Sequence, residues 1–148
     1  MVKILWVDDE IELLKPHVLF LRGKGYEVDT CNNGYDAIDM ATEGSYDLII
    51  LDPPAFAKHK NVLRNALQGY RKLNAIAFEK IKPGGILFTF SCSQAVTKEL
   101  FRTMIFSAAA IAGRNVRILH QLHQPADHPI NIYHPEGEYL KGLVLYVE

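Results

Sequence analysis

The sequence has few cysteines, no large excess of either charge and no long hydrophobic run. Its two cysteines, Cys31 and Cys92, are too few for a disulfide framework and lack metal-site spacing, so a reducing, cytoplasmic compartment is expected. The 16 basic and 17 acidic side chains give a net charge of −1, so nucleic acid is not expected as a partner. Apolar runs such as 48–51 are far shorter than the ~20 residues of a membrane-spanning helix, so no membrane association is expected either.

The remaining composition is that of a globular protein with one core. Of the 148 residues, 49% are hydrophobic and 22% are charged, and no linker or repeat interrupts them, which predicts a single domain over 1–148. Hydrophobic patterning predicts strands at 2–7, 26–30, 47–51, 86–90, 115–122 and 140–147. It predicts helices at 10–24, 34–43, 60–81 and 94–112.

Strands that alternate with helices of this length predict an α/β fold, a parallel sheet covered by helices on both faces. No helix separates the last two predicted strands, so the last strand is expected to run antiparallel. The fold class is therefore a three-layer αβα sandwich.

The first third of the chain resembles the receiver domain of response regulators. The resemblance rests on Lys3-Ile4-Leu5-Trp6-Val7-Asp8-Asp9-Glu10, Gly25-Tyr26-Glu27-Val28, Asn33-Gly34-Tyr35-Asp36-Ala37 and Tyr46-Asp47-Leu48-Ile49-Ile50-Leu51-Asp52. It implies a flavodoxin-like beginning with strand order 2-1-3.

The rest of the chain is similar to the carboxy-terminal half of a Rossmann-like methyltransferase, of the family that modifies cytosine C5 in large-subunit ribosomal RNA. The similarity rests on Leu51-Asp52-Pro53-Pro54-Ala55-Phe56, Lys82-Pro83-Gly84-Gly85, Phe90-Ser91-Cys92-Ser93 and the 127–142 segment. The two resemblances together imply a mostly parallel six-stranded sheet of order 2-1-3-4-6-5.

Two resemblances that meet at residues 46–52 predict an engineered chimera, receiver-like over 1–47 and methyltransferase-like over 48–148. Such a chain is expected to be monomeric, to require no partner, and to have no complete active site and hence no enzymatic activity. Two alternatives stay open. One is a receiver-like phosphoacceptor module that binds Mg²⁺ weakly, and the other is a methyltransferase fragment with residual RNA binding.

The receiver resemblance implies a metal site of three carboxylates, Asp8, Asp9 and Asp52, because Mg²⁺ prefers clustered oxygen ligands. Asp52 is the candidate phosphoacceptor, and the Pro54 carbonyl is a further candidate ligand. Thr89 or Ser91 is expected to replace the Ser or Thr that binds the phosphoryl group. The receiver's strand-5 lysine has no match, and only Lys58 is a distant substitute.

The methyltransferase resemblance implies that Cys92 matches the cysteine that adds to C6 of the target cytosine. It places Asp52, Pro53 and the residues through Phe56 around the base. The glycine-rich turn for S-adenosylmethionine is replaced by Val7-Asp8-Asp9-Glu10, and Cys31-Asn32-Asn33-Gly34 replaces the acid that holds the ribose. We therefore expect no cofactor apart from weak Mg²⁺, and Cys92 to be vestigial.

Overall fold

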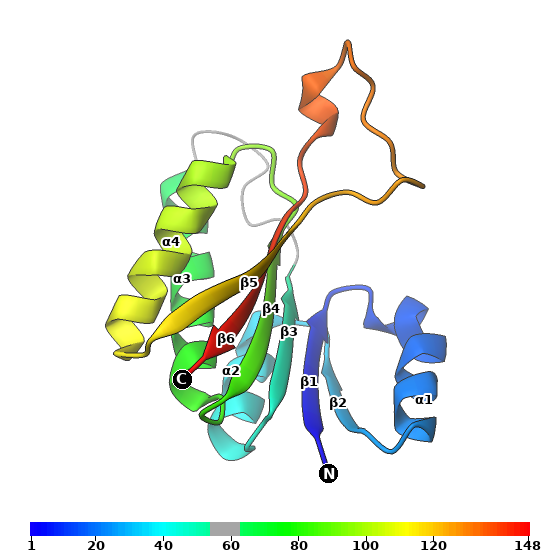
Figure 1. The fold of residues 1–148 in the computed structure, drawn as a ribbon, viewed down its shortest axis with the longest axis vertical. Helices are drawn as coiled ribbons and strands as arrows, with labels where there is room; N and C mark the ends of the chain where they lie inside the picture. The colour runs from blue at the N-terminus through cyan, green and yellow to red at the C-terminus, as the bar shows by residue number, and fades with distance from the viewer. Residues whose placement is uncertain (54–62) are drawn as a thin grey trace.

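A six-stranded sheet runs through the described residues, 1–53 and 63–148, of the computed structural model (Figure 1). The strands are β1 (Lys3–Asp8), β2 (Glu27–Cys31), β3 (Leu48–Asp52), β4 (Gly85–Ser91), β5 (Val116–Leu122) and β6 (Lys141–Val147). Their order is β2-β1-β3-β4-β6-β5. The pairs among β1 to β4 are parallel, whereas β6 is antiparallel to both β4 and β5. The predicted fold class and strand order are confirmed.

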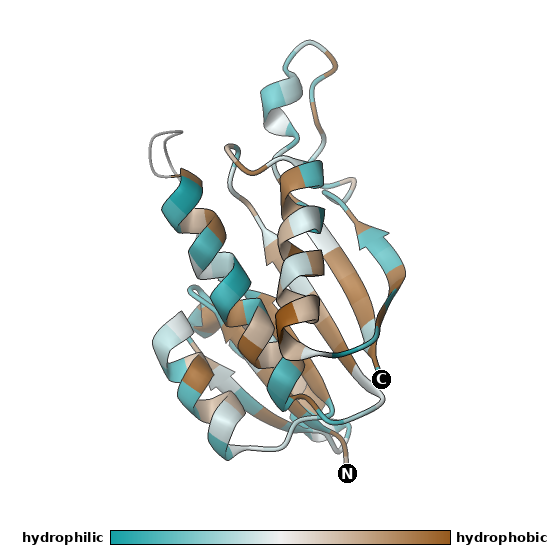
Figure 2. Cartoon of the chain, turned by 90° about the vertical axis from the view of Figure 1, so that its left-hand side faces the viewer, coloured by the Kyte–Doolittle hydropathy of each residue, from teal (hydrophilic) through white to brown (hydrophobic). Residues whose placement is uncertain are grey.

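In the described part of the chain, four α-helices cover the two faces of the sheet unequally. They are α1 (Lys15–Gly23), α2 (Gly34–Glu43), α3 (Leu63–Lys80) and α4 (Lys98–Ala112). The α2, α3 and α4 helices pack in sequence on one face, while α1 lies on the other face beside β2 (Figure 1). Figure 2 shows α3 and α4 side by side in front of largely apolar strands.

The alternation of side chains along each strand separates two cores. In β1, Leu5 and Val7 belong to the large core beneath α2, α3 and α4, whereas Ile4 belongs to the small core beneath α1. In β3, Ile49 faces the large core and Ile50 packs against the small one. Period-two alternation therefore buries both faces of the central strands, as expected for a parallel sheet with helices on each side.

Local chemistry at helix starts accounts for the differences from the predicted helix limits. The predicted helix at 10–24 is divided into a 3-10 turn, Ile11–Leu14, and α1, in which Pro16 occupies the first turn. Proline lacks an N–H group and is tolerated there because that group would have no helical partner. The predicted helix at 94–112 begins only at Lys98, because the Thr97 side chain accepts the Leu100 N–H group at 3.1 Å and caps it.

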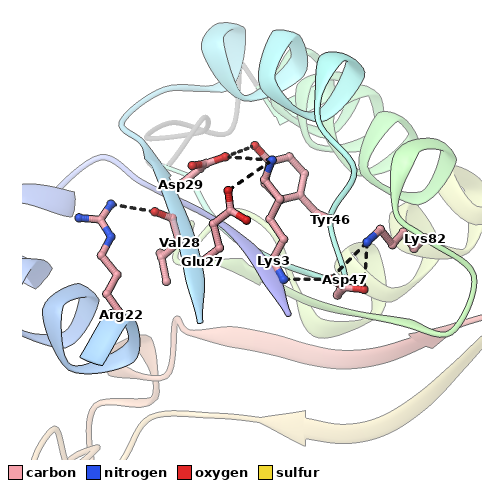
Figure 3. A network of polar contacts seen from close by, with 8 residues as sticks. All are labelled: Lys3, Arg22, Glu27, Val28, Asp29, Tyr46, Asp47 and Lys82. Atoms are coloured by element: carbon pink, nitrogen blue, oxygen red, sulfur yellow. Dashed lines mark hydrogen bonds and ion pairs between the residues drawn. The ribbon is translucent and has the colours of Figure 1, made fainter. Parts of the chain in front are cut away.

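A polar network joins the amino ends of the strands (Figure 3). The Lys3 N–H group donates to Asp47 Oδ2 at 2.8 Å, and Lys82 forms an ion pair with Asp47 at 3.4 Å. The Tyr46 hydroxyl donates to Asp29 Oδ2 at 2.7 Å. These contacts fix the starts of β1, β3 and β4 relative to one another and join the start of β3 to β2, at the edge opposite to the carboxyl ends of the parallel strands.

None of the helices in residues 1–53 and 63–148 combines the length and the apolar character that a membrane span requires.

Candidate functional site

A hollow of about 480 Å³ opens at the carboxyl ends of β1, β3 and β4. Asp8 ends β1, Asp52 ends β3, and Cys92 follows the last residue of β4. His128 and Tyr139, from the long segment between β5 and β6, also line it. In parallel sheets this edge is the usual place for ligands, since the loops that follow the strands converge there.

Asp8 and Asp52 are directly opposite each other in the register of β1 and β3. Asp8 is 8% exposed, and its Oδ1 atom accepts the Glu10 N–H group at 2.8 Å. Burial, followed by the charge of Asp8 and a hydrogen bond with its carboxyl group, raises the pKa of Asp52 to about 7. Two adjacent, partly buried carboxylates would repel each other if both were charged, so Asp52 keeps a proton close to neutral pH.

Cys92 is half-buried and lines the same hollow. Burial raises the pKa of its thiol, and the charge of Asp52 raises it further, whereas the charge of Lys141 lowers it. Cys31, the other cysteine, is buried at the end of β2, and its thiol donates to the Asn33 carbonyl at 3.0 Å. The structure therefore gives only Cys92 a place beside a hollow that could admit a substrate.

The predicted metal site stays a prediction. Among the described residues, no group of three or more His, Cys, Asp or Glu side chains is placed to hold a metal ion. The two parts that Pro54 and Lys58 were to supply lie outside the described residues. We therefore assign no chemical step to a metal at Asp8, Asp9 and Asp52.

Neither predicted substitute for the phosphoryl-binding hydroxyl faces solvent. Thr89 and Ser91 are each 0% exposed. The Thr89 hydroxyl donates to Asn74 Oδ1 at 2.6 Å, and the Asn74 amide donates to the Tyr70 carbonyl at 2.8 Å. Thr89 is thus part of a buried polar chain between β4 and α3, which leaves the receiver-like alternative without a hydroxyl from β4.

The turn after β1 does not fit S-adenosylmethionine. Three acidic side chains, Asp8, Asp9 and Glu10, stand where the methyltransferase resemblance requires glycine, and the Glu10 N–H group is already bonded to Asp8. At the end of β2 the buried Cys31 thiol stands where an acid would hold the ribose. These positions therefore do not provide the groups that a methyl donor needs, and the expected lack of a cofactor stays a prediction.

Sequence reasoning gave no site role to three residues around Cys92, namely His128, Tyr139 and Lys141, although all three lie in the methyltransferase-like segment 127–142. The first two lie in an irregular segment, for which periodicity carries no information about direction. Lys141 carries one sequence signal, which is a charged residue at the start of an otherwise apolar strand, Lys141–Val147. That signal marks the position as unusual, but it does not indicate which groups the lysine contacts.

Comparison with curated proteins shows that most of the chain is homologous to a methyltransferase. Over 100 residues, 68% of this chain, it is 51% identical to the ribosomal RNA large subunit methyltransferase I of Tolumonas auensis, and it covers 25% of that protein. The chain thus spans about a quarter of the length of the curated relatives it matches. No family model matches the sequence.

Comparison with solved structures agrees with the fold. A protein of Streptococcus mutans described as a SAM-dependent methyltransferase superposes with a TM-score of 0.72 at 15% identity, over 98% of this chain and 44% of that one. A response regulator of Thermotoga maritima, in complex with Mg²⁺ and BeF, is 30% identical over 55% of this chain and 65% of its own. Its TM-score is 0.40.

Two expectations from the sequence are wrong. The expected engineered chimera without an active site, and the expected lack of enzyme function, are contradicted by the 51% identity to a named methyltransferase. The homology indicates a methyltransferase fragment, which was one of the alternatives left open. The altered donor turn spans only residues 7–10, whereas the homology extends over 100 residues.

Proposed function

We propose that the chain is the substrate-base portion of a ribosomal RNA methyltransferase, and that Cys92 is its nucleophile toward a cytosine base. The observation that carries the proposal is the position of Cys92, which lines the hollow at the carboxyl ends of the strands beside Asp52. The homology to ribosomal RNA large subunit methyltransferase I supports RNA as the substrate class. The sequence resemblance supports cytosine C5 as the position that becomes reactive.

The chemistry of this portion is a reversible covalent addition. The Cys92 thiol gives its proton to solvent, and the thiolate sulfur forms a bond to C6 of the ring while the π bond between C5 and C6 breaks. The electron pair of that π bond moves to C5 and makes it nucleophilic. When no methyl donor is present, C5 takes a proton from solvent. Loss of the original C5 proton and expulsion of the thiolate then restore the base. The net result is exchange of the C5 hydrogen with solvent.

Asp52 can assist because its carboxyl group titrates near neutral pH. With a pKa of about 7, it holds a proton in a substantial fraction of molecules and can exchange it with a bound base. The same raised pKa has a benefit for Cys92, since a neutral Asp52 opposes formation of the thiolate less than a charged one does.

Low overall charge limits how strongly RNA is held. The net charge of −1 provides little long-range attraction for phosphates, so we expect weak, salt-sensitive binding. The expectation that nucleic acid is not a partner is thus replaced, in this proposal, by binding that requires low ionic strength.

Hydrogen exchange at cytidine C5 tests the proposal without a methyl donor. The protein is incubated at low salt in D₂O with an RNA oligonucleotide that contains cytidine, and deuterium at C5 is measured by mass spectrometry. We expect exchange with the natural sequence and with the matched control Cys31→Ser, and none above background with Cys92→Ser. Exchange that persists in Cys92→Ser, or that is absent in the natural sequence, would refute the proposal.

A further inference from the structure

Lys141 is a buried lysine whose charge is not matched by a carboxylate. It is the first residue of β6 and is only 6% exposed. Its ammonium group donates to the Ser93 carbonyl at 2.6 Å and to the Val96 carbonyl at 2.5 Å. Among the ion pairs found in residues 1–53 and 63–148, none involves Lys141.

Such a placement is energetically costly for a lysine. Burial disfavours a charged amine, and it lowers the pKa of Lys141 accordingly. The nearest groups do not fully offset this cost, because Cys92 favours the charged amine while Lys98 on α4 opposes it. An apolar residue at this position would avoid that penalty, and Leu143, Val144 and Leu145 further along β6 are apolar.

The two carbonyls that Lys141 holds belong to the short segment after Cys92. Ser91 and Lys141 are paired in the register of β4 and β6, so the backbone of Lys141 lies beside the residue that precedes Cys92. The Ser93 N–H group donates to the Ser91 hydroxyl at 3.3 Å, and the Val96 N–H group donates to the Ser93 carbonyl at 3.2 Å. Ser93 and Val96 are each nearly completely buried.

We propose that Lys141 is a positioning residue for Cys92, because its ammonium group fixes the segment from Ser93 to Val96 and thereby sets where the thiol is presented at the hollow. This inference rests on the proposed function, since it assigns the lysine to the reaction of Cys92. Lys141 does not itself line the hollow with Cys92, so apart from the effect of its charge on the pKa of the thiol it acts on the reaction through the segment that it anchors.

The test compares Lys141→Met with the matched control Lys98→Met. Both substitutions remove a lysine head group next to the same segment, but Lys98 is mostly exposed and pairs with Glu138. Lys141→Arg keeps a cation with several donors and serves as the conservative rescue. If Lys141→Met does not fold, Lys141→Gln replaces it, because glutamine keeps a donor of shorter reach.

Two measurements are made on each variant. The first is amide hydrogen exchange by NMR at Ser93 and Val96, with Leu87 in β4 as an internal reference for global unfolding. The second is the cytidine C5 exchange reaction, analysed as kcat and KM for the RNA oligonucleotide.

We expect Lys141→Met to speed amide exchange at Ser93 and Val96 but not at Leu87. We also expect it to lower kcat with little change in KM. Lys141→Arg should restore both quantities, and Lys98→Met should change neither.

The outcomes distinguish this inference from the proposed function. Unchanged amide exchange at Ser93 and Val96 in Lys141→Met would overturn the inference whatever the RNA reaction does. Faster amide exchange with an unaltered kcat, in a natural sequence that is active, would overturn the positioning role alone. If the natural sequence shows no C5 exchange, the proposed function fails together with the positioning role of Lys141 in that reaction, and the amide measurement by itself decides whether Lys141 anchors the segment from Ser93 to Val96.

Discussion

Replacing Ile49 by alanine tests whether β3 joins the chain into one cooperative sheet. Ile49 is 1% exposed, faces the large core, and is flanked in register by Leu5 on β1 and Leu87 on β4. The substitution removes all of the side chain beyond Cβ. Paired strands on both sides prevent collapse around the cavity, so we expect a loss in the upper half of about 2–5 kcal/mol.

The assay is urea unfolding followed by circular dichroism, with the melting temperature as a second measure. A domain of this size loses about 2–4 °C per kcal/mol, so a loss in the upper half of that range should lower Tm by about 7–20 °C. Ile50→Ala is the matched control, because Ile50 is only half-buried and faces the small core, and it should cost less. A loss below about 1 kcal/mol for Ile49→Ala, or two separate unfolding transitions, would refute the reasoning.

Three further substitutions follow from particular contacts. Thr89→Val leaves the buried Asn74 carbonyl oxygen without its hydroxyl donor and should cost about 1–3 kcal/mol in urea unfolding. Tyr46→Phe removes the hydrogen bond to Asp29 and should cost about 1 kcal/mol. Burial raises the pKa of Tyr46, so this tyrosine does not ionise near the ordinary tyrosine pKa while the protein is folded. Absorbance titration of the folded proteins should therefore count the same number of tyrosines ionising near that pKa in the natural sequence and in Tyr46→Phe. One fewer in the variant would contradict this. The pKa of Asp52, raised to about 7 when folded from about 4 when unfolded, makes stability fall as pH rises between these values, so Asp52→Asn should flatten that fall between about pH 4 and pH 7. Millimolar Mg²⁺ should raise Tm of the natural sequence by a few degrees but not that of Asp52→Asn, and an unchanged Tm would contradict the predicted metal site.

The sheet could be predicted because its evidence is local and repeated. The central strands β1, β3 and β4 are short apolar runs that alternate with periodic helices, and the absent helix before β6 indicates its antiparallel direction. The order of the strands came from the two family resemblances. The meeting of Asp8 and Asp52 also followed from sequence, because both residues end parallel strands and parallel strands share one carboxyl edge.

The parts of the site that depend on long-range contacts could not be predicted in this way. Nothing near Thr89 in the sequence shows that its hydroxyl faces Asn74 on α3 and not the hollow. Likewise, Lys141 is 45 residues from Val96, and only the position of β6 beside β4 brings its ammonium group to that carbonyl. Alternation within a strand gives the face of a side chain, but it does not give the partner of a polar end group.

The placement of β6 between β4 and β5 sets an order for folding during synthesis. When residues up to 140 have emerged, β4 has one open edge, and β5 has no strand with which to pair, because its partner in the sheet is β6. When β6 inserts between β4 and β5, it forms hydrogen bonds with both strands at once. Its first residue, Lys141, also donates a hydrogen bond to the segment after Cys92. A nascent chain that lacks 141–147 would therefore expose the β4 edge and leave the thiol segment unanchored, so the last strand completes the sheet and the candidate site in the same event.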